Sequence, residues 1–145
     1  MDTQENKILS SMKMEKMVFE KIEFNRLGFK NDNNPKFNIE SNFMQSASNK
    51  DLFKVELIMK CTKEEEYNFV IKLVGFFSFD SESSLSDVDR DLLISRNAIA
   101  IMMPYMRSQI SLLTAQPEMD CIVLPTFNIN SLIDKKSPSD KDGID

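Results

Sequence analysis

Acidic side chains are the groups in this sequence whose type and spacing come closest to supporting catalysis. They form two clusters, Glu64–Glu66 and the alternating aspartates Asp87, Asp89 and Asp91. Two neighbouring carboxylates can act as a general acid and a general base. Both clusters fall in an expected loop or at an expected helix start, where acidic residues usually face solvent or interact with the helix dipole. We therefore interpret them as surface charge, and we expect the chain not to be an enzyme.

The residue types that metal and nucleophile chemistry require are missing or scarce. There is no histidine, the commonest general base and metal ligand, and only 3 glycines are present, with no phosphate-binding loop among them. The aspartates at 87–91 lack the glycine and the terminal glutamate of a calcium-binding EF-hand. Cys61 and Cys121 cannot by themselves complete a structural zinc site. Because both cysteines have apolar, strand-like neighbours, we expect two buried free thiols, no metal and no catalytic residue.

The composition is that of one globular domain. The chain has 145 residues, of which 41% are hydrophobic and 28% charged. The net charge of −5 argues against nucleic acid as a partner, because phosphate binding requires a basic surface. No apolar run is long enough to cross a bilayer, and the first residues lack a signal-peptide pattern. We expect a cytoplasmic protein that does not insert into membranes.

Four segments alternate apolar and polar residues, which is the pattern of half-buried strands. They span about residues 17–25, 36–43, 52–62 and 67–79. The links between them are polar and short. The pattern predicts an antiparallel meander with one face in solvent.

A long helix is predicted from about Asp87 to Ala115, and Pro104 is expected to kink or divide it. One apolar stripe recurs every three or four residues and consists of Ile99, Met103, Met106, Ile110 and Leu113. A second stripe beside it consists of Ala98, Ile101, Tyr105 and Leu112. A helix that is apolar on more than one side is usually buried on more than one side. We therefore expect a second subunit to cover part of it, with an oligomer interface at Ile99, Met103, Tyr105, Met106 and Ile110.

The two ends of the chain are more polar than its middle. Residues 1–16 are expected to form a flexible arm before a single domain at 17–135. A short C-terminal helix is predicted within Asn128–Lys135. The remaining residues, 136–145, are expected to form a disordered tail.

Several short motifs follow one another in a characteristic order. The most specific is Met103-Pro104-Tyr105-Met106-Arg107, inside the predicted helix. The other segments are Phe19–Phe24, Lys63–Asn68, Gly75–Phe79 and Leu124–Ile133. Over about residues 18–133 this order resembles the SecB family of bacterial protein-export chaperones, whose long helix carries an internal Pro-Tyr-Ala-Arg element.

The resemblance implies a fold and a function. The expected fold is α+β: a four-stranded antiparallel sheet, a long helix interrupted by proline and a short C-terminal helix, assembled as a tetramer (a dimer of dimers). The implied function is that of a holdase, a chaperone that binds unfolded or presecretory polypeptides in apolar grooves without ATP or another cofactor and supports protein export. The high content of Phe and Met, 11 and 10 residues, suits a surface that accepts many shapes, although core packing accounts for much of it.

Candidate client-binding residues come from the resemblance and from apolar character. The resemblance points to Phe37 and Ile39 on the second strand. Apolar character and location add Phe43, Phe77, Phe127, Leu132 and Ile133. For each of these seven residues, packing in the core is an equally good interpretation.

Some positions depart from the family pattern. Where family members that work with the SecA motor carry acidic residues, this chain has Lys21, Asn25 and Val70, which leaves binding to SecA in doubt. Two alternatives therefore stay open beside a general holdase. One is a dedicated SecB-like chaperone of a toxin–antitoxin system, and the other is a structural protein that uses the same elements only to oligomerise.

Overall fold

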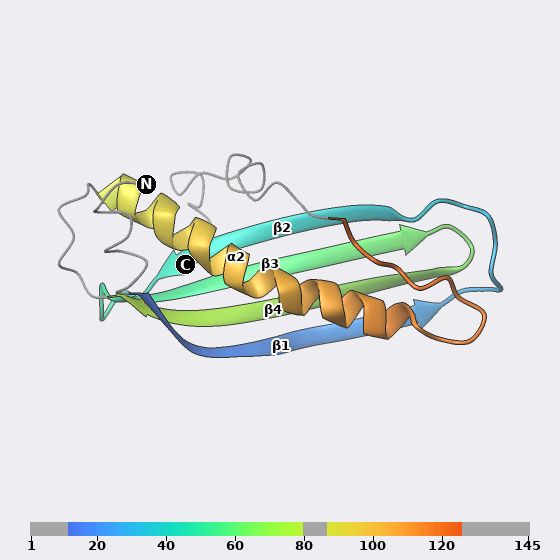
Figure 1. The fold of residues 1–145 in the computed structure, drawn as a ribbon, viewed down its shortest axis with the longest axis horizontal. Helices are drawn as coiled ribbons and strands as arrows, with labels where there is room; N and C mark the ends of the chain where they lie inside the picture. The colour runs from blue at the N-terminus through green and yellow to red at the C-terminus, as the bar shows by residue number, and fades with distance from the viewer. Residues whose placement is uncertain (1–11, 80–86, 126–145) are drawn as a thin grey trace.

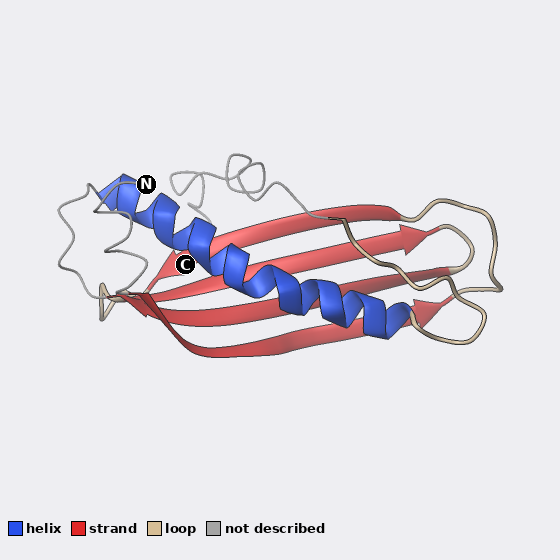
Figure 2. Ribbon diagram, in the orientation of Figure 1, coloured by secondary structure: helices blue, strands red, loops and turns tan. Residues whose placement is uncertain are grey.

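The computed structural model describes residues 12–79 and 87–125, which form a four-stranded sheet covered on one face by a long helix (Figures 1 and 2). The elements are β1 (Met12–Arg26), β2 (Lys36–Gln45), β3 (Leu52–Lys63), β4 (Tyr67–Phe79) and α2 (Asp87–Thr114). This confirms the predicted α+β fold. The predicted C-terminal helix lies outside the described residues, as do the tail and residues 1–11 of the expected arm. Residues 12–16, also expected in that arm, belong to β1.

The strand order in the sheet is β1-β4-β3-β2, and every neighbouring pair is antiparallel. β2, β3 and β4 follow one another through short turns, whereas β1 lies at the opposite edge from β2. This is a Greek-key arrangement, so the predicted simple meander was wrong in the placement of β1. The connection between β1 and β2, residues 27–35, is long enough to cross three strand spacings of about 4.8 Å each.

Two β-bulges explain why β1 has an irregular sequence pattern. The register with β4 shifts between Met14 and Lys16 and again between Phe19 and Lys21. Each bulge inserts one extra residue and so shifts the alternation by one position after it. As a result the apolar residues on the helix side of β1 follow uneven spacings. They are Met12, Met14, Met17, Phe19, Ile22 and Phe24.

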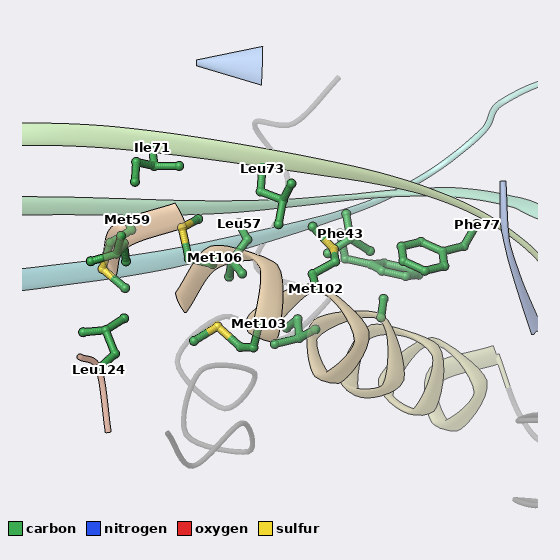
Figure 3. Packing of buried hydrophobic residues seen from close by; sticks show 14 of the residues in the cluster. Phe43, Leu57, Met59, Ile71, Leu73, Phe77, Met102, Met103, Met106 and Leu124 are labelled. Atoms are coloured by element: carbon green, nitrogen blue, oxygen red, sulfur yellow. The ribbon is translucent and has the colours of Figure 1, made fainter. Parts of the chain in front are cut away.

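The core lies between α2 and the two central strands. Leu57, Leu73 and Phe77 from the sheet are fully buried against Met102 and Met106 from α2 (Figure 3). Burial of this apolar surface is the main force that holds the helix on the sheet. Pro104 lies inside α2 on its exposed side and does not divide the helix.

Gly75 lies on the helix side of β4, next to the side chain of Met102. A Cβ atom at this position would lie 3.0 Å from the sulfur of Met102 and 2.7 Å from the Phe77 ring. A larger residue would therefore force the Phe77 ring or the Met102 side chain to move, and this accounts for the glycine in an otherwise bulky strand.

After α2 the chain turns back along the helix. We call residues 119–125 the return segment. The Ser111 hydroxyl donates a hydrogen bond to the Ile122 carbonyl (2.7 Å), and the Thr114 hydroxyl accepts one from the Ile122 amide (2.8 Å). Arg107 donates to the carbonyl of Leu124 (3.1 Å), whose side chain is buried in the core (Figure 3). Three side chains of one helix thus fix an extended segment that has no strand partner.

Candidate functional site

The helix leaves the two edges of the sheet partly open. In Figure 1, α2 crosses the sheet diagonally and its contacts are mainly with β3 and β4. On the helix side of the edge strands, Ile22 of β1 remains 45% exposed and Phe37 of β2 remains 39% exposed. Each edge strand also pairs with a neighbour on one side only, among the strands that the structure describes. Apolar side chains and unpaired strand edges therefore occur together.

The edge at β2 offers the clearest site for an extended polypeptide. Phe37 and Ile39 point to the helix side of the sheet, and we call these two residues the β2 patch. Ile39 is half-buried against the core, opposite Met59 of β3. Leu124 of the return segment belongs to the same buried cluster as Met59 (Figure 3). An extended chain could bury its side chains on the β2 patch and pair its backbone with the free edge of β2.

The other predicted client-binding residues are distributed differently. Phe43 and Phe77 are buried in the core, and Phe77 has no exposed surface. Their side chains are therefore committed to packing in this arrangement. Phe127, Leu132 and Ile133 lie outside the described residues.

The predicted oligomer interface divides between the two sides of α2. Four of its five residues face the sheet and are buried in the core of their own chain: Ile99, Met103, Met106 and Ile110. Tyr105 faces outward and is 53% exposed. Of the five, only Tyr105 is open to a second chain in this arrangement.

The outward side of α2 is itself apolar. Ile101, Tyr105 and Leu112 form an exposed row along it, which we call the outer stripe, and Leu112 is 70% exposed. A hollow of about 630 Å³ between α2 and the return segment borders this stripe and is lined in part by Leu112 and Val123. The sequence contains both apolar stripes of the helix, but nothing in their composition indicates which one packs on the sheet.

The sheet face opposite α2 carries charges that neutralise one another. Lys72 lies 2.9 Å from Glu20 and 3.1 Å from Glu56, and Lys54 lies 3.6 Å from Glu56. Hydrogen bonds that Lys72 donates to Glu20 and then to Glu56 raise the pKa of Lys72. Burial disfavours the charged form of Glu56, but hydrogen bonds from Lys72 and Asn42 outweigh it and lower the pKa of this carboxyl. These carboxylates are held by lysines of the same chain.

Lys21, Asn25 and Val70, which stand where SecA-binding family members were expected to carry acidic residues, lie on this same face. Lys21 pairs with Glu23 at 3.8 Å, and the Asn25 side chain donates a hydrogen bond to that of Asn68. Val70 lies opposite Glu23 in the register of β1 and β4.

The two cysteines differ from each other. Both are free thiols, but only Cys61 is buried, so the expectation of two buried thiols was wrong for Cys121. The reason is that Cys121 lies in the return segment, outside the sheet. Burial raises the pKa of Cys61 to about 12. The described residues contain no cluster of side chains that could hold a metal ion, and no helix among them has the length and hydropathy needed to cross a membrane.

The sequence matches no protein-family model and no curated protein. Solved structures do match. A SecB-like chaperone of Mycobacterium tuberculosis, solved in complex with a ChAD peptide from the HigA1 antitoxin, superposes with a TM-score of 0.69 at 9% identity, over 86% of this chain and 94% of that one. A Streptococcus agalactiae protein of unknown function matches with a TM-score of 0.46 at 13% identity, over 79% of this chain and 97% of that one. The chain therefore has the SecB-like fold that its motif order predicted.

Proposed function

We propose that this protein is an ATP-independent holdase that binds apolar segments of unfolded polypeptides on the β2 patch and the neighbouring free edge of β2. The observation that carries the proposal is the exposed Phe37 on a strand whose outer edge pairs with no other described strand, in a chain with the SecB-like fold. Backbone pairing along a strand edge does not depend on sequence, and flat apolar subsites tolerate many side chains. Phe127, Leu132 and Ile133 remain part of the proposed client-binding surface.

The proposed working form is a cytoplasmic tetramer in which the outer stripe of α2 is covered by a second subunit. Ile101, Tyr105 and Leu112 would otherwise leave three large apolar side chains of α2 in water. Assembly would place several β2 patches on one particle and so increase the avidity for a long unfolded client. Support for protein export follows from the same resemblance and is proposed with it.

A dedicated chaperone of one antitoxin is the second candidate. It is favoured by the structural similarity to a SecB-like chaperone that was solved with a peptide from an antitoxin. Both candidates use the same surface, and they differ in the number of clients that the surface accepts.

Aggregation assays test the first proposal. The protein should suppress the aggregation of several unrelated denatured proteins without ATP when it is present in about equimolar amounts. The double variant Phe37→Ser/Ile39→Ser should lose most of this protection, because it removes the apolar side chains of the β2 patch. Asn38→Ser is the matched control, since Asn38 lies between them on β2 but points to the opposite face.

The outcomes separate the candidates. Protection of a single partner would favour the dedicated chaperone. If the protein protects none of the denatured proteins from aggregation, oligomerisation alone would remain as the proposed role of the fold. Equal protection by the double variant and the wild type would show that clients bind elsewhere.

A further inference from the structure

A second hollow lies on the sheet face opposite α2, at the end where β4 leads towards the helix. Its volume is about 350 Å³. It is lined by Met44, Gln45, Ser46, Leu52, Phe53, Lys54 and Phe76. Met44, Leu52 and Phe76 alternate along their strands with residues that point into the core, so they face away from the helix. The lining is mainly apolar and open to solvent.

Two lysines stand over the aromatic ring in this hollow. The Lys16 ammonium lies 4.8 Å from the centroid of the Phe76 ring, and the Lys54 ammonium lies 6.0 Å from it. Cation–π attraction favours both positions. The two charges approach the ring from different strands, β1 and β3, and so flank it.

These lysines are less neutralised than the charges at the centre of the same face. Within residues 12–79 and 87–125, no ion pair involves Lys16. Lys54 shares Glu56 with Lys72, and the distance from Glu56 to Lys54 is the longer one, at 3.6 Å against 3.1 Å. Glu15, next to Lys16, accepts a hydrogen bond from Ser78. The hollow therefore combines an apolar floor with a lysine on either side of the Phe76 ring.

We propose that this hollow binds a short acidic segment of a partner protein. One large apolar side chain of the segment would fill the hollow against Phe76, and flanking carboxylates would lie beside Lys16 and Lys54. Opposite charges at the border would favour encounter and orientation, and the apolar contact would supply affinity. Because this face points away from the β2 patch and the outer stripe, such a partner could bind while a client is held and while the chain is assembled.

Fluorescence anisotropy with two labelled probe peptides tests the proposal on the full-length protein. One probe has a central Leu-Phe pair flanked by aspartates, and the other has lysines in place of the aspartates. The acidic probe should bind and the basic probe should not. Lys16→Glu should weaken the acidic probe about tenfold, and higher salt should weaken it as well, because the border charges are exposed.

Two further variants locate the binding site. Phe76→Thr should weaken the acidic probe by removing the apolar floor, with circular dichroism used to verify folding. Lys21→Glu is the matched charge control, because it lies on the same strand and face but away from the hollow. It should bind like the wild type.

The proposal is wrong if neither probe binds, if both bind equally, or if Lys16→Glu and Lys21→Glu have the same effect. Phe37→Ser should leave the acidic probe unaffected. If this variant instead abolishes binding, the peptide is held as a client on the β2 patch, and the hollow is not its site.

Discussion

At the scale of single residues, Glu66 is a buried carboxylate that joins two parts of the fold. It lies 2.7 Å from Lys63 across the turn between β3 and β4, and it accepts a hydrogen bond from the Asn31 amide at 2.9 Å. Its own carbonyl accepts hydrogen bonds from the amides of Leu27 and Gly28. Burial disfavours its charged form, but Lys63 and the Asn31 amide outweigh this and lower the pKa of Glu66 below its ordinary value of 4.5. Glu66 thus fixes the connection between β1 and β2 to the turn between β3 and β4.

This geometry predicts a loss of stability in acid. Because the folded state lowers the pKa of Glu66, the folded chain binds this proton less readily than the unfolded chain does. The stabilisation is therefore present at neutral pH and is lost as the pH falls below about 4.5. Urea unfolding at about pH 7 and about pH 3 should show a smaller acid-dependent loss for Glu66→Gln than for the wild type. Glu64→Gln, an exposed change in the same turn, should behave like the wild type.

Lys63 gives a second prediction at this site. Lys63→Met should lower the free energy of unfolding by about 3 kcal/mol, because it leaves a buried carboxylate without its cation. Replacing both residues, as in Lys63→Met/Glu66→Leu, should cost less than this single change. Additive losses in urea unfolding would contradict the coupling of the pair.

The two thiols should react at very different rates. Cys61 is buried with a pKa of about 12, whereas Cys121 is exposed in the return segment. At low protein concentration, a thiol reagent should label one cysteine per chain quickly and the second only after unfolding. Cys121→Ser should abolish the fast reaction, and Cys61→Ser should retain it. Rapid labelling of both thiols in the native wild type would contradict the burial of Cys61.

At the scale of elements, α2 is a helix with two apolar sides, one buried against the sheet and the other exposed. The side that contains Met102 and Met106 packs on the sheet, and the outer stripe does not. The sequence predicted the length of this helix almost to the residue, because its apolar spacing is regular over many turns. It could not assign its sides, because isoleucine and leucine occur on both. That assignment depends on which stripe is complementary to β3 and β4.

The outer stripe leads to a prediction about assembly. Leu112→Glu should weaken self-association by about 100-fold or more, because it would place a charge in an apolar contact, while the circular dichroism spectrum stays unchanged. Light scattering or analytical ultracentrifugation measures the change. Lys60→Glu, an exposed change on the opposite face of the sheet, is the control for added negative charge. A Leu112→Glu protein that assembles like the wild type would rule out the outer stripe as the interface.

β1 shows why the sequence predicted the positions of the strands better than the exposure of individual side chains. In β3 and β4, every second residue from Phe53 to Cys61 and from Tyr67 to Phe79 is buried, and these buried faces agree with the prediction. In β1, the bulges at Glu15 and Glu20 change the spacing, so the exposed Met14 and Ile22 were not recognised as surface residues on the helix side. A bulge is set by pairing with β4, and this pairing cannot be read from β1 alone.

At the scale of the whole molecule, the fold class followed from local patterns and the strand order did not. Alternation and turn residues are local properties, and they indicated four strands and a helix. The position of β1 depends on pairing between Met12 and Phe79, at opposite ends of the sheet sequence. Of the residues predicted to bind clients, Phe37 is exposed and Ile39 half-buried, whereas Phe43 and Phe77 are buried in the core. The diagonal path of α2 determines which side chains on the helix side of the sheet stay exposed. This path cannot be predicted from the sequence of any single strand.

The position of β1 also affects how the chain is made. β1 is the first strand to leave the ribosome, but its partner β4 is the last, so β1 stays unpaired until Phe79 has been synthesised. Contacts between such distant segments form slowly, and they leave apolar strand edges accessible in the meantime. During its own synthesis this chain therefore leaves the apolar side chains of an unpaired β1 segment accessible, as in the clients it is proposed to hold. A completed copy could bind the β1 segment of a nascent one, which would make the protein an early client of itself.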